Sequence, residues 1–470
     1  MRALAKVLPA GVLVALSFGL CGFASDPAQK VGADIIVTAA PVYAPLAVLR
    51  GEERFPKGAH LLLIHEGTAA PLAPHFAASA DAQVSFDGTM VLFAGKRNEG
   101  DPWQIWELTL ANRTVRKVLT TPTDAERPFY LPSERLIYAL RTPQGFRLQS
   151  DETGRKPKFT PMNPSARPGP LQLSYVRASA FPTGVLKDGR ILFESGYPLG
   201  SGTTPEMYLV YADGSGVESY RCDHGRARWG GEQLASGDVV FTHGASLARF
   251  TSPLAHEEHV TAPPAEYAGA IAETSTGAWL LSARASANAH YTIRLWTPGT
   301  AAMETVAAET GENLVEPVLV APRTTPKRHP SALHPWNYAN LLALDARLSR
   351  DGALKGTPTS VRLETQDAEG RAVVMGTAPV ERDGSFFVEV PGDTPLRFTL
   401  LDAKGAVLRQ ERGWFWARSG EQRICVGCHT GPERSPDNRV PAVLLRTTTP
   451  VDLTRASKTD SARQAKPGGR

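Results

Sequence analysis

The chain has 470 residues, including 42 glycines and 38 prolines, and a formal net charge of +4 at pH 7. This length predicts two or three domains, and both residue types exceed their average usage of about 7% and 5%, which favours short strands and turns over long helices. The charge is small and no basic stripe is interleaved with aromatic residues, so we expect no nucleic-acid binding. After the first residues the longest apolar runs are too short for a transmembrane span.

Residues 1–24 have the pattern of a secretory signal peptide. Arg2 and Lys6 supply positive charge before the apolar run Val7–Leu20, and small residues follow it. We therefore expect a periplasmic or otherwise extracytoplasmic protein. Cys21 leaves a lipid anchor open as an alternative, although leucine precedes it where a small residue is expected.

A unit consisting of a turn and an apolar strand recurs from about residue 80 to residue 325. Its clearest copy is Ser85-Phe86-Asp87-Gly88 followed by Met90–Ala94. Further copies lie at residues 186–193 and 235–241, and weaker ones at 276–281 and 131–140. Units of about forty to fifty residues with short strands are typical of propeller blades. We predict a β-propeller over residues 25–325, with an unrelated string of β-hairpins as the alternative.

Five copies are visible, and a propeller must close into a ring. We expect about six blades, the sixth joining residues 313–321 to an N-terminal strand near residues 61–65. The turn Ser85-Phe86-Asp87-Gly88 and the strand after it resemble the blade repeat of TolB-type propellers. That resemblance implies a fold and no particular activity.

The polar, proline-broken stretch 323–330 marks a boundary, and a second region of short strands follows it. Apolar residues alternate along these strands, and Asp383-Gly384 marks a hairpin turn. We predict a small β-sandwich over residues 335–412, which makes the whole chain all-β. The residues expected to share a face within each strand are Val361, Leu363 and Thr365; Phe386, Val388 and Val390; and Leu396, Phe398 and Leu400.

The sequence Cys425-Val426-Gly427-Cys428-His429 is a CxxCH motif. Two thiols at this spacing can add across the two vinyl groups of a porphyrin, and the adjoining histidine then supplies an axial nitrogen to the iron. We predict one covalent haem c, attached through Cys425 and Cys428 and ligated by His429.

Three other interpretations of the motif remain open. A thioredoxin-like dithiol expects a strand-to-helix setting that the polar flanks do not provide. A zinc site needs two more ligands, which Cys222 and a histidine would have to supply. The motif can also occur by chance.

Residues 413–442 are expected to form the haem-binding segment. Trp414 and Trp416 are candidates to wall the porphyrin, and Arg418 and Arg423, with Arg412, are candidates to pair with its propionates. The alternative is that the tryptophans are ordinary core residues and the arginines a solvated face. Residues 443–470 are expected to be a basic, disordered tail.

The second axial ligand is less constrained. No methionine or histidine follows the motif, so a ligand would have to come from upstream. His329 and His334, in the connection between the two domains, are the candidates. An open sixth position is equally consistent, and it decides between carrying electrons and binding a small ligand.

The order of propeller, sandwich and CxxCH motif resembles the hydrazine synthase alpha-subunit family. The run from Arg418 to His429 is similar to that family's haem segment, and Val380–Leu401 is similar to its middle domain. The resemblance implies a six-bladed propeller, a middle domain with one c-type haem, and a further domain with a second haem. This sequence has one CxxCH motif and ends soon after it, so we expect a single haem. Ser419 and Thr430 depart from the family's pattern.

Three functions follow from these features. The leading hypothesis is an exported mono-haem c-type cytochrome that transfers electrons, with the propeller docking a redox partner protein. The second, which the resemblance implies, is a hydrazine synthase-like haem oxidoreductase, whose iron binds small nitrogen compounds. The third is a propeller scaffold in which the haem is structural.

Overall fold

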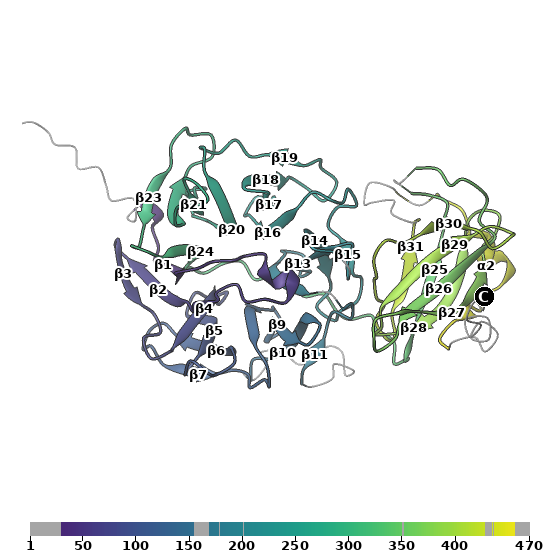
Figure 1. Ribbon diagram of the computed structural model, residues 1–470, viewed down its shortest axis with the longest axis horizontal. Coiled ribbons are helices and arrows are strands. Elements are labelled where there is room, and N and C mark those ends of the chain that lie inside the picture. The colour runs from purple at the N-terminus through teal and green to yellow at the C-terminus, as the bar shows by residue number, and fades with distance from the viewer. Residues whose placement is uncertain are drawn as a thin grey trace, which may run out of the picture.

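The computed structural model describes residues 30–154, 169–177, 179–200, 202–349, 352–427, 435 and 437–455. The predicted signal peptide with Cys21, the motif residues Cys428 and His429, and the tail beyond residue 455 lie outside these ranges. The described chain folds almost entirely into strands, which form a larger and a smaller body side by side (Figure 1). The predicted all-β fold is confirmed.

The larger body is a β-propeller of six four-stranded antiparallel sheets. In the order of the blades, from the innermost strand outward, the strands are β24 (Asn313–Leu319), β1 (Ile35–Ala40), β2 (His60–His65), β3 (Thr68–Pro71); β4 (Ala78–Val84), β5 (Met90–Lys96), β6 (Gln104–Thr109), β7 (Val115–Lys117); β8 (Ala125–Tyr130), β9 (Arg135–Thr142), β10 (Gly145–Glu152), β11 (Leu171–Gln172); β12 (Ala180–Val185), β13 (Ile191–Tyr197), β14 (Thr204–Val210), β15 (Glu218–Ser219); β16 (Arg228–Gln233), β17 (Val239–His243), β18 (Ser246–Phe250), β19 (Glu258–His259); β20 (Glu266–Glu273), β21 (Trp279–Arg284), β22 (Thr292–Trp296), β23 (Glu304–Ala307). The six innermost strands contact one another in sequence and β24 contacts β4, so the ring is closed.

The turns predicted from the repeat connect the first two strands of their blades. Gly88, Gly189, Gly237 and Gly277 all have positive φ, and each donates its N–H to the carbonyl three residues earlier. Only glycine adopts this conformation at little cost, which explains why the repeat is marked by it. In the copy at residues 131–140, Glu134 has the positive φ instead of a glycine.

Closure of the ring depends on strands from both ends of the propeller. β24 pairs antiparallel with β1, from Ile35 opposite Leu319 to Ala40 opposite Asn313, and β1 pairs with β2. The prediction placed β24 and β2 in one sheet correctly but missed β1 between them. All six residues of β1 are buried and show no alternation, so the strand lacks the periodic signal that marks the others.

The innermost strands share one irregularity. Each shows a shift in register against its blade neighbour near the middle of the strand. At five of these bulges one residue has positive φ, namely Asp81, Arg127, Gly230, Gly269 and Glu316. A bulge redirects the side chain of the extra residue, and the three charged residues of this group meet inside the ring.

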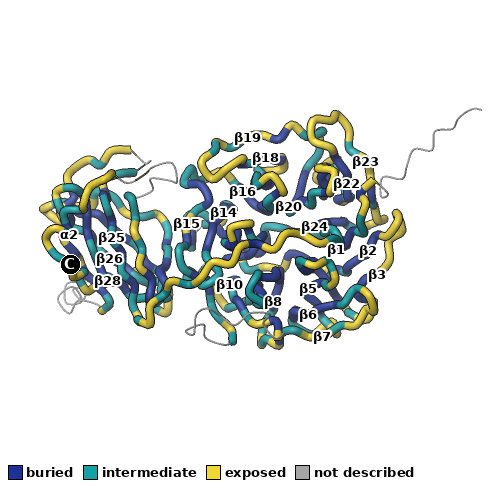
Figure 2. Tube along the Cα trace, turned by 180° about the vertical axis from the view of Figure 1, so that it is seen from behind, coloured by how far each residue is buried: buried dark blue, intermediate teal, exposed yellow. Residues whose placement is uncertain are grey.

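The smaller body is a β-sandwich. One sheet has the order β31 (Gln422–Cys425), β25 (Tyr338–Ala343), β28 (Phe386–Pro391), β32 (Val451–Asp452), and the other β27 (Ala372–Pro379), β26 (Ser360–Gln366), β29 (Leu396–Leu401), β30 (Val407–Gln410). Of the predicted inward-facing residues all are buried except Thr365, which is half-buried. Buried segments concentrate within the blades and between these two sheets (Figure 2).

The predicted disordered tail is wrong for its first part. Residues Ala442–Arg446 form the short helix α2, and β32 pairs parallel with β28. Val443 and Leu453 are buried in the sandwich; these apolar contacts order the segment, and its basic composition had masked them. Among the described residues no helix has the length and apolar character needed to span a membrane.

The two bodies are joined by more than the connection between them. Trp414 and Trp416 belong to one buried cluster with propeller residues that include Phe193 and Tyr208. The Trp414 N–H donates to Leu199 O at 2.8 Å, and Trp416 Nε1 donates to the carbonyl of Gly214 at 2.9 Å. The segment that precedes the CxxCH motif is therefore anchored on the fourth blade.

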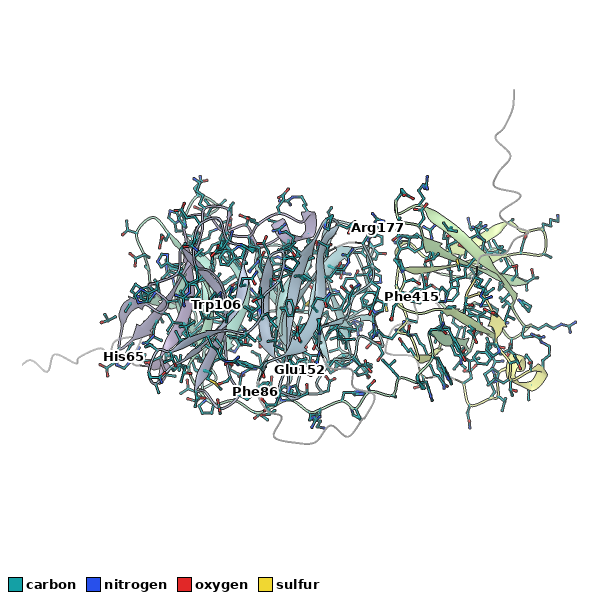
Figure 3. All side chains as sticks on the ribbon, turned by 90° about the horizontal axis from the view of Figure 1, so that it is seen from below. His65, Phe86, Trp106, Glu152, Arg177 and Phe415 are labelled. Carbon is teal, nitrogen blue, oxygen red and sulfur yellow. The ribbon has the colours of Figure 1, made fainter. Side chains whose placement is uncertain are left out.

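A second contact lies beside this one. Arg177 of the propeller donates to the carbonyl of Ala368 in the sandwich at 2.6 Å. Phe415 packs against the cores of both bodies, and Figure 3 shows Arg177 and Phe415 on the facing sides of the two bodies.

Candidate functional site

The candidate site is built on β31, the edge strand of the sandwich sheet nearest the propeller (Figure 1). β31 runs parallel to β25, with Cys425 opposite Ala343. Leu344 N–H donates to the Cys425 carbonyl at 2.9 Å. The first cysteine of the motif is therefore held by main-chain hydrogen bonds at the end of a strand, which fixes the position from which its thiol projects.

A tight turn sets the direction of β31. Gly420 has φ +85°, and a Cβ there would lie 1.9 Å from the carbonyl oxygen of His334. His334 N–H donates to the Gly420 carbonyl at 2.9 Å, and Gly420 N–H donates to Tyr338 O at 2.7 Å. Only glycine fits this conformation and this close approach, so the segment that carries the CxxCH motif is fastened to the connection between the two bodies.

The Cys425 thiol is half-buried and forms no disulfide. Burial raises its pKa, Glu411 and Glu421 raise it further, and Arg423 opposes the shift. The thiol is therefore protonated at neutral pH. Burial also raises the pKa of Glu411 to about 7, although its carboxylate accepts a hydrogen bond from Phe398 N–H.

A shallow pocket adjoins Val426, the residue after this cysteine. Its cavity volume is only about 20 Å³, and Leu344, Leu348 and Pro441 supply apolar walls. Asp345, Asp437 and Arg439 line its polar side. Ile424 and Val440, 65% and 59% exposed, present further apolar surface on either side of the motif.

These features suit a covalently attached haem. A porphyrin needs a free thiol on a fixed backbone, apolar surface for its faces and cationic groups for its propionates. Cys425 meets the first requirement and the exposed apolar residues meet the second. Nη2 of Arg423 is buried and has no hydrogen-bond partner among the described residues, so it is available for an anionic group.

The two predicted tryptophans lie within protein contacts. Trp416 is completely buried, with Tyr175 and Phe193 rings 6.3 and 6.4 Å from its own. The Arg397 guanidinium stacks 4.4 Å from the Trp414 ring. These contacts match the core alternative considered for both residues, and contact with a haem stays a prediction.

The predicted arginines differ in their surroundings. Arg418 is buried, donates to Asp393 at 2.9 Å and to the Gln172 carbonyl at 3.3 Å, and lies 5.1 Å from the Tyr175 ring. Arg423 donates through Nε to Glu421 at 2.8 Å. Arg412 is exposed and donates to Tyr197 Oη at 3.2 Å. Arg423 lies nearest the motif, whereas Arg418 is engaged at the junction of the two bodies.

The two candidate distal histidines are separated. His329 is exposed and stacks on Tyr211 of the propeller with ring centroids 4.0 Å apart. His334 stacks on Trp336 at 4.3 Å, and its Nε2 hydrogen bonds to Gln422 Nε2 at 2.9 Å. His334 therefore lies beside β31. Neither residue is tested as an iron ligand, because His429 and Cys428 lie outside the described residues.

The sequence analysis missed an ion-pair group at this end of the sandwich. Arg347 forms two 2.7 Å hydrogen bonds with the buried Asp345, and Arg439 approaches the same carboxylate at 3.8 Å. Asp345 and Arg439 both line the pocket beside Val426. Nothing in the local sequence links residues 345 and 439, so no signal was available to find this pair.

The fold defines a class: a six-bladed β-propeller joined to a β-sandwich that carries a CxxCH motif on its edge strand. Residues 346–430 match the family model described as the hydrazine synthase alpha subunit middle domain. The sandwich therefore resembles that middle domain, and the resemblance predicted from the sequence is confirmed.

Two solved structures are similar to this chain. Hydrazine synthase from Kuenenia stuttgartiensis aligns with a TM-score of 0.73 and 17% identity, over 88% of this chain and 71% of that one. TolB from Acinetobacter baumannii aligns with a TM-score of 0.44 and 12% identity, over 63% and 67%. At these identities the likeness concerns the fold. No curated protein matches the chain.

Proposed function

We propose that this chain carries one covalent haem c, attached through Cys425 and Cys428 with His429 as an axial ligand, and transfers single electrons outside the cytoplasm. The observation that supports this most strongly is the family match, which extends to residue 430 and so includes the whole CxxCH motif. The free, strand-anchored thiol of Cys425 supports it from the geometry.

The haem would supply one-electron chemistry at its iron. The chain's own residues would fix and shield it. β31 and the Gly420 turn set the position of Cys425. Arg423 would offer a buried guanidinium nitrogen to a propionate, and the apolar wall of the pocket beside Val426 would limit water at the porphyrin face. The propeller, held rigidly through Trp414 and Trp416, would dock a redox partner protein.

A second candidate function is haem oxidoreductase chemistry of the hydrazine synthase type, acting on small nitrogen compounds. The match of residues 346–430 to that family's middle domain favours it. The two candidates differ at the sixth position of the iron: an electron carrier has it filled by a protein ligand such as His334, whereas an enzyme leaves it open.

The haem itself is tested by producing the full chain in cells that attach c-type haem. We expect the purified protein to exceed its polypeptide mass by one haem and to show a Soret band after denaturation. Cys425→Ala combined with Cys428→Ala should abolish both signals. Cys222→Ala, which changes the other cysteine of the described residues that forms no disulfide, should retain them. A wild-type mass equal to that of the bare polypeptide would overturn the proposal.

Carbon monoxide separates the two functions once the haem is present. An electron carrier should show a six-coordinate, low-spin spectrum that carbon monoxide does not change. Suppose that carbon monoxide leaves the spectra of the wild type and of His329→Ala unchanged but alters that of His334→Ala. This result would identify His334 as the distal ligand. A carbon monoxide complex in the wild type would instead favour the enzyme.

Export is part of the proposal. Residues 1–24 would direct secretion and be removed, and Cys21 offers lipid attachment as the alternative. Mass spectrometry of the N-terminal peptide from the periplasmic fraction distinguishes the two, since acylation leaves a lipid-modified cysteine at the new terminus. An intact N-terminus on cytoplasmic protein would contradict export.

A further inference from the structure

Two edge strands of the sandwich, one from each sheet, lie on the same side of the smaller body. β30 is the last strand of one sheet and β31 the first strand of the other, and both are at the upper side of the sandwich in Figure 1. Toward the other side, β27 of one sheet contacts β28 of the other. Because the CxxCH motif begins on β31, the residues that end β30 belong to its surroundings.

The side chain of Cys425 points toward the interior of the sandwich. β31 pairs in parallel with β25, with Cys425 opposite Ala343 and Ile424 opposite Leu342. Side chains alternate between the two faces along a strand, and residues in register share a face. Ala343 is buried in the sandwich, whereas Ile424 is 65% exposed. The thiol therefore projects into the space between the two sheets, on the side where β30 lies.

Glu411, the residue after β30, brings a carboxyl group to this space. Its N–H donates to Phe398 O at 3.1 Å, and its Oε2 accepts a hydrogen bond from Phe398 N–H at 3.3 Å, so the side chain is held against β29. Glu411 is half-buried. After burial and the opposing Arg423, it is the next group that determines the pKa of the Cys425 thiol, which it raises. The carboxyl group and the first cysteine of the motif therefore interact electrostatically.

The cations around Glu411 are paired with other carboxylates. Arg397 donates to Glu364 at 2.8 Å, and Arg423 donates to Glu421 at 2.8 Å. Within the described part of the chain Glu411 itself forms no ion pair. Burial raises its pKa to about 7, and the hydrogen bond from the main chain, Arg423 and Arg397 oppose the shift. A carboxyl group in this position responds to a charge that is placed beside it.

A haem bonded to Cys425 would bring such a charge. Ferric iron gives the porphyrin core a net positive charge, and an opposite charge nearby favours the ionised carboxylate. Reduction makes the core neutral, and burial then favours the protonated carboxyl group. Glu411 would therefore bind a proton more tightly in the reduced state than in the oxidised state. By linkage, the bound proton favours reduction to the same extent.

We propose that Glu411 is a redox-linked proton acceptor, which takes up one proton when the haem receives an electron and releases it when the electron leaves. The inference rests on the proposed haem and adds proton transfer to its electron transfer. In the balanced step, one electron from the redox partner protein reduces ferric to ferrous iron, and one proton from water converts the Glu411 carboxylate to the carboxyl group. The half-buried position of Glu411 gives the proton access from solvent.

The midpoint potential of the full-length haem protein, measured by spectroelectrochemistry between pH 5 and pH 9, tests the proposal. We expect the potential to fall as the pH rises toward about 7, by at most about 59 mV per pH unit, and to level off above it. Glu411→Gln keeps an oxygen for the Phe398 N–H but cannot ionise, so its potential should lose this slope and stay near the low-pH value of the wild type. A wild-type potential that does not depend on pH, or the same slope in Glu411→Gln, would overturn the proposal.

The matched control is Glu389→Gln. Glu389 is also half-buried, and burial and Asp452 raise its pKa. It stands on β28 between the buried residues Val388 and Val390, so its side chain points away from the space between the sheets. This variant should retain the wild-type slope. Loss of the slope in Glu389→Gln as well would show that the effect does not belong to Glu411.

Failure of this inference is distinguishable from failure of the proposed function. A protein without a Soret band contains no haem, which overturns the proposed function and this inference with it; a haem protein with a pH-independent potential overturns only the inference. If Glu411→Gln does not fold, infrared difference spectra of the wild type labelled with ¹³C-glutamate decide. A protonated carboxyl band that shifts with the label is expected on reduction, and its absence would sink the proposal.

Discussion

At the scale of single residues, two glycines share a backbone conformation but differ in their surroundings. Gly420 and Gly405 have nearly the same φ, +85° and +81°. A Cβ on Gly405 meets nothing within 4 Å, whereas on Gly420 it would overlap the His334 carbonyl. Substitutions at the two positions therefore distinguish the cost of a steric clash from the cost of the left-handed conformation.

We expect Gly405→Ala to lower the free energy of unfolding by about 1–2 kcal/mol, the cost of a left-handed conformation with a Cβ. Gly420→Ala should cost about 2–4 kcal/mol, since the turn must also move away from His334. Urea denaturation of both variants measures the difference. Equal losses would show that the turn tolerates a side chain and does not fix β31.

A buried carboxyl provides a residue-scale test of pH dependence. Burial raises the pKa of Glu126 from 4.5 to about 8; Asp81 and Asp124 also raise it, while Arg54 and Arg141 oppose the shift. Between pH 4.5 and 8 the folded state therefore binds more protons at this site than the unfolded state. Stability from this group is greatest at low pH and falls as the pH rises through that window.

Replacement by glutamine should remove this contribution. Glu126→Gln is expected to flatten the decline in the free energy of unfolding between pH 5 and pH 8, measured by urea denaturation at each pH. Glu134→Gln, which changes a half-buried turn residue, is the control and should retain the wild-type slope. An unchanged slope in Glu126→Gln would assign the pH dependence elsewhere.

At the scale of elements, one buried side chain ties the β1–β2 connection to two strands of the ring, β4 and β24. Arg54 is 2% exposed and contacts both Asp81 and Glu316. Four residues earlier, Arg50 pairs with Glu52 at the surface, where both side chains are more than half exposed. Removing one partner of a buried pair leaves a buried charge, whereas a surface pair contributes little.

Arg54→Ala should therefore cost about 3–5 kcal/mol of unfolding free energy, and Arg50→Ala less than about 1 kcal/mol. Chemical denaturation measures both, and limited proteolysis of the connection reports whether it leaves the ring. A small effect of Arg54→Ala with an intact connection would mean that Phe55 and Tyr43, whose rings stack 5.5 Å apart, hold it instead.

Elements with a local signal were predictable. Turns with a glycine at positive φ mark four blades, and alternating residues such as Val388 and Val390 mark the sandwich strands. The charged residues that meet at the centre of the propeller carry no such signal. Asp81 and Glu316 are each the one charged residue of their strand, and Arg127 is paired in sequence only with Glu126. The three meet only because three blades bring their bulges together. The contact of Trp416 with Gly214 spans 202 positions, which a single sequence does not reveal.

At the scale of the whole molecule, the tryptophan anchor determines whether the two bodies behave as one. Trp416 is fully buried against the fourth blade. Trp416→Ala should cost about 3–5 kcal/mol and split a single calorimetric transition into two, since the propeller and the sandwich would then unfold separately.

Trp336→Ala is the matched control for this test. Trp336 is only partly buried and stacks between His334 and Tyr338 in the connection. Its removal should leave one transition. Two transitions already present in the wild type would show that the junction transmits no cooperativity.

The pairing of β1 with β24 also has a consequence for how the chain is made. One edge of β1 stays unpaired until β24 has left the ribosome, because Ala40 and its partner Asn313 lie 273 positions apart in the sequence. That edge is covered only when the ring is complete. Until then, an apolar strand with unpaired main-chain groups can pair with other chains. Biosynthesis of this protein therefore contains a vulnerable interval, in which a chaperone that holds the nascent N-terminal segment would raise the yield.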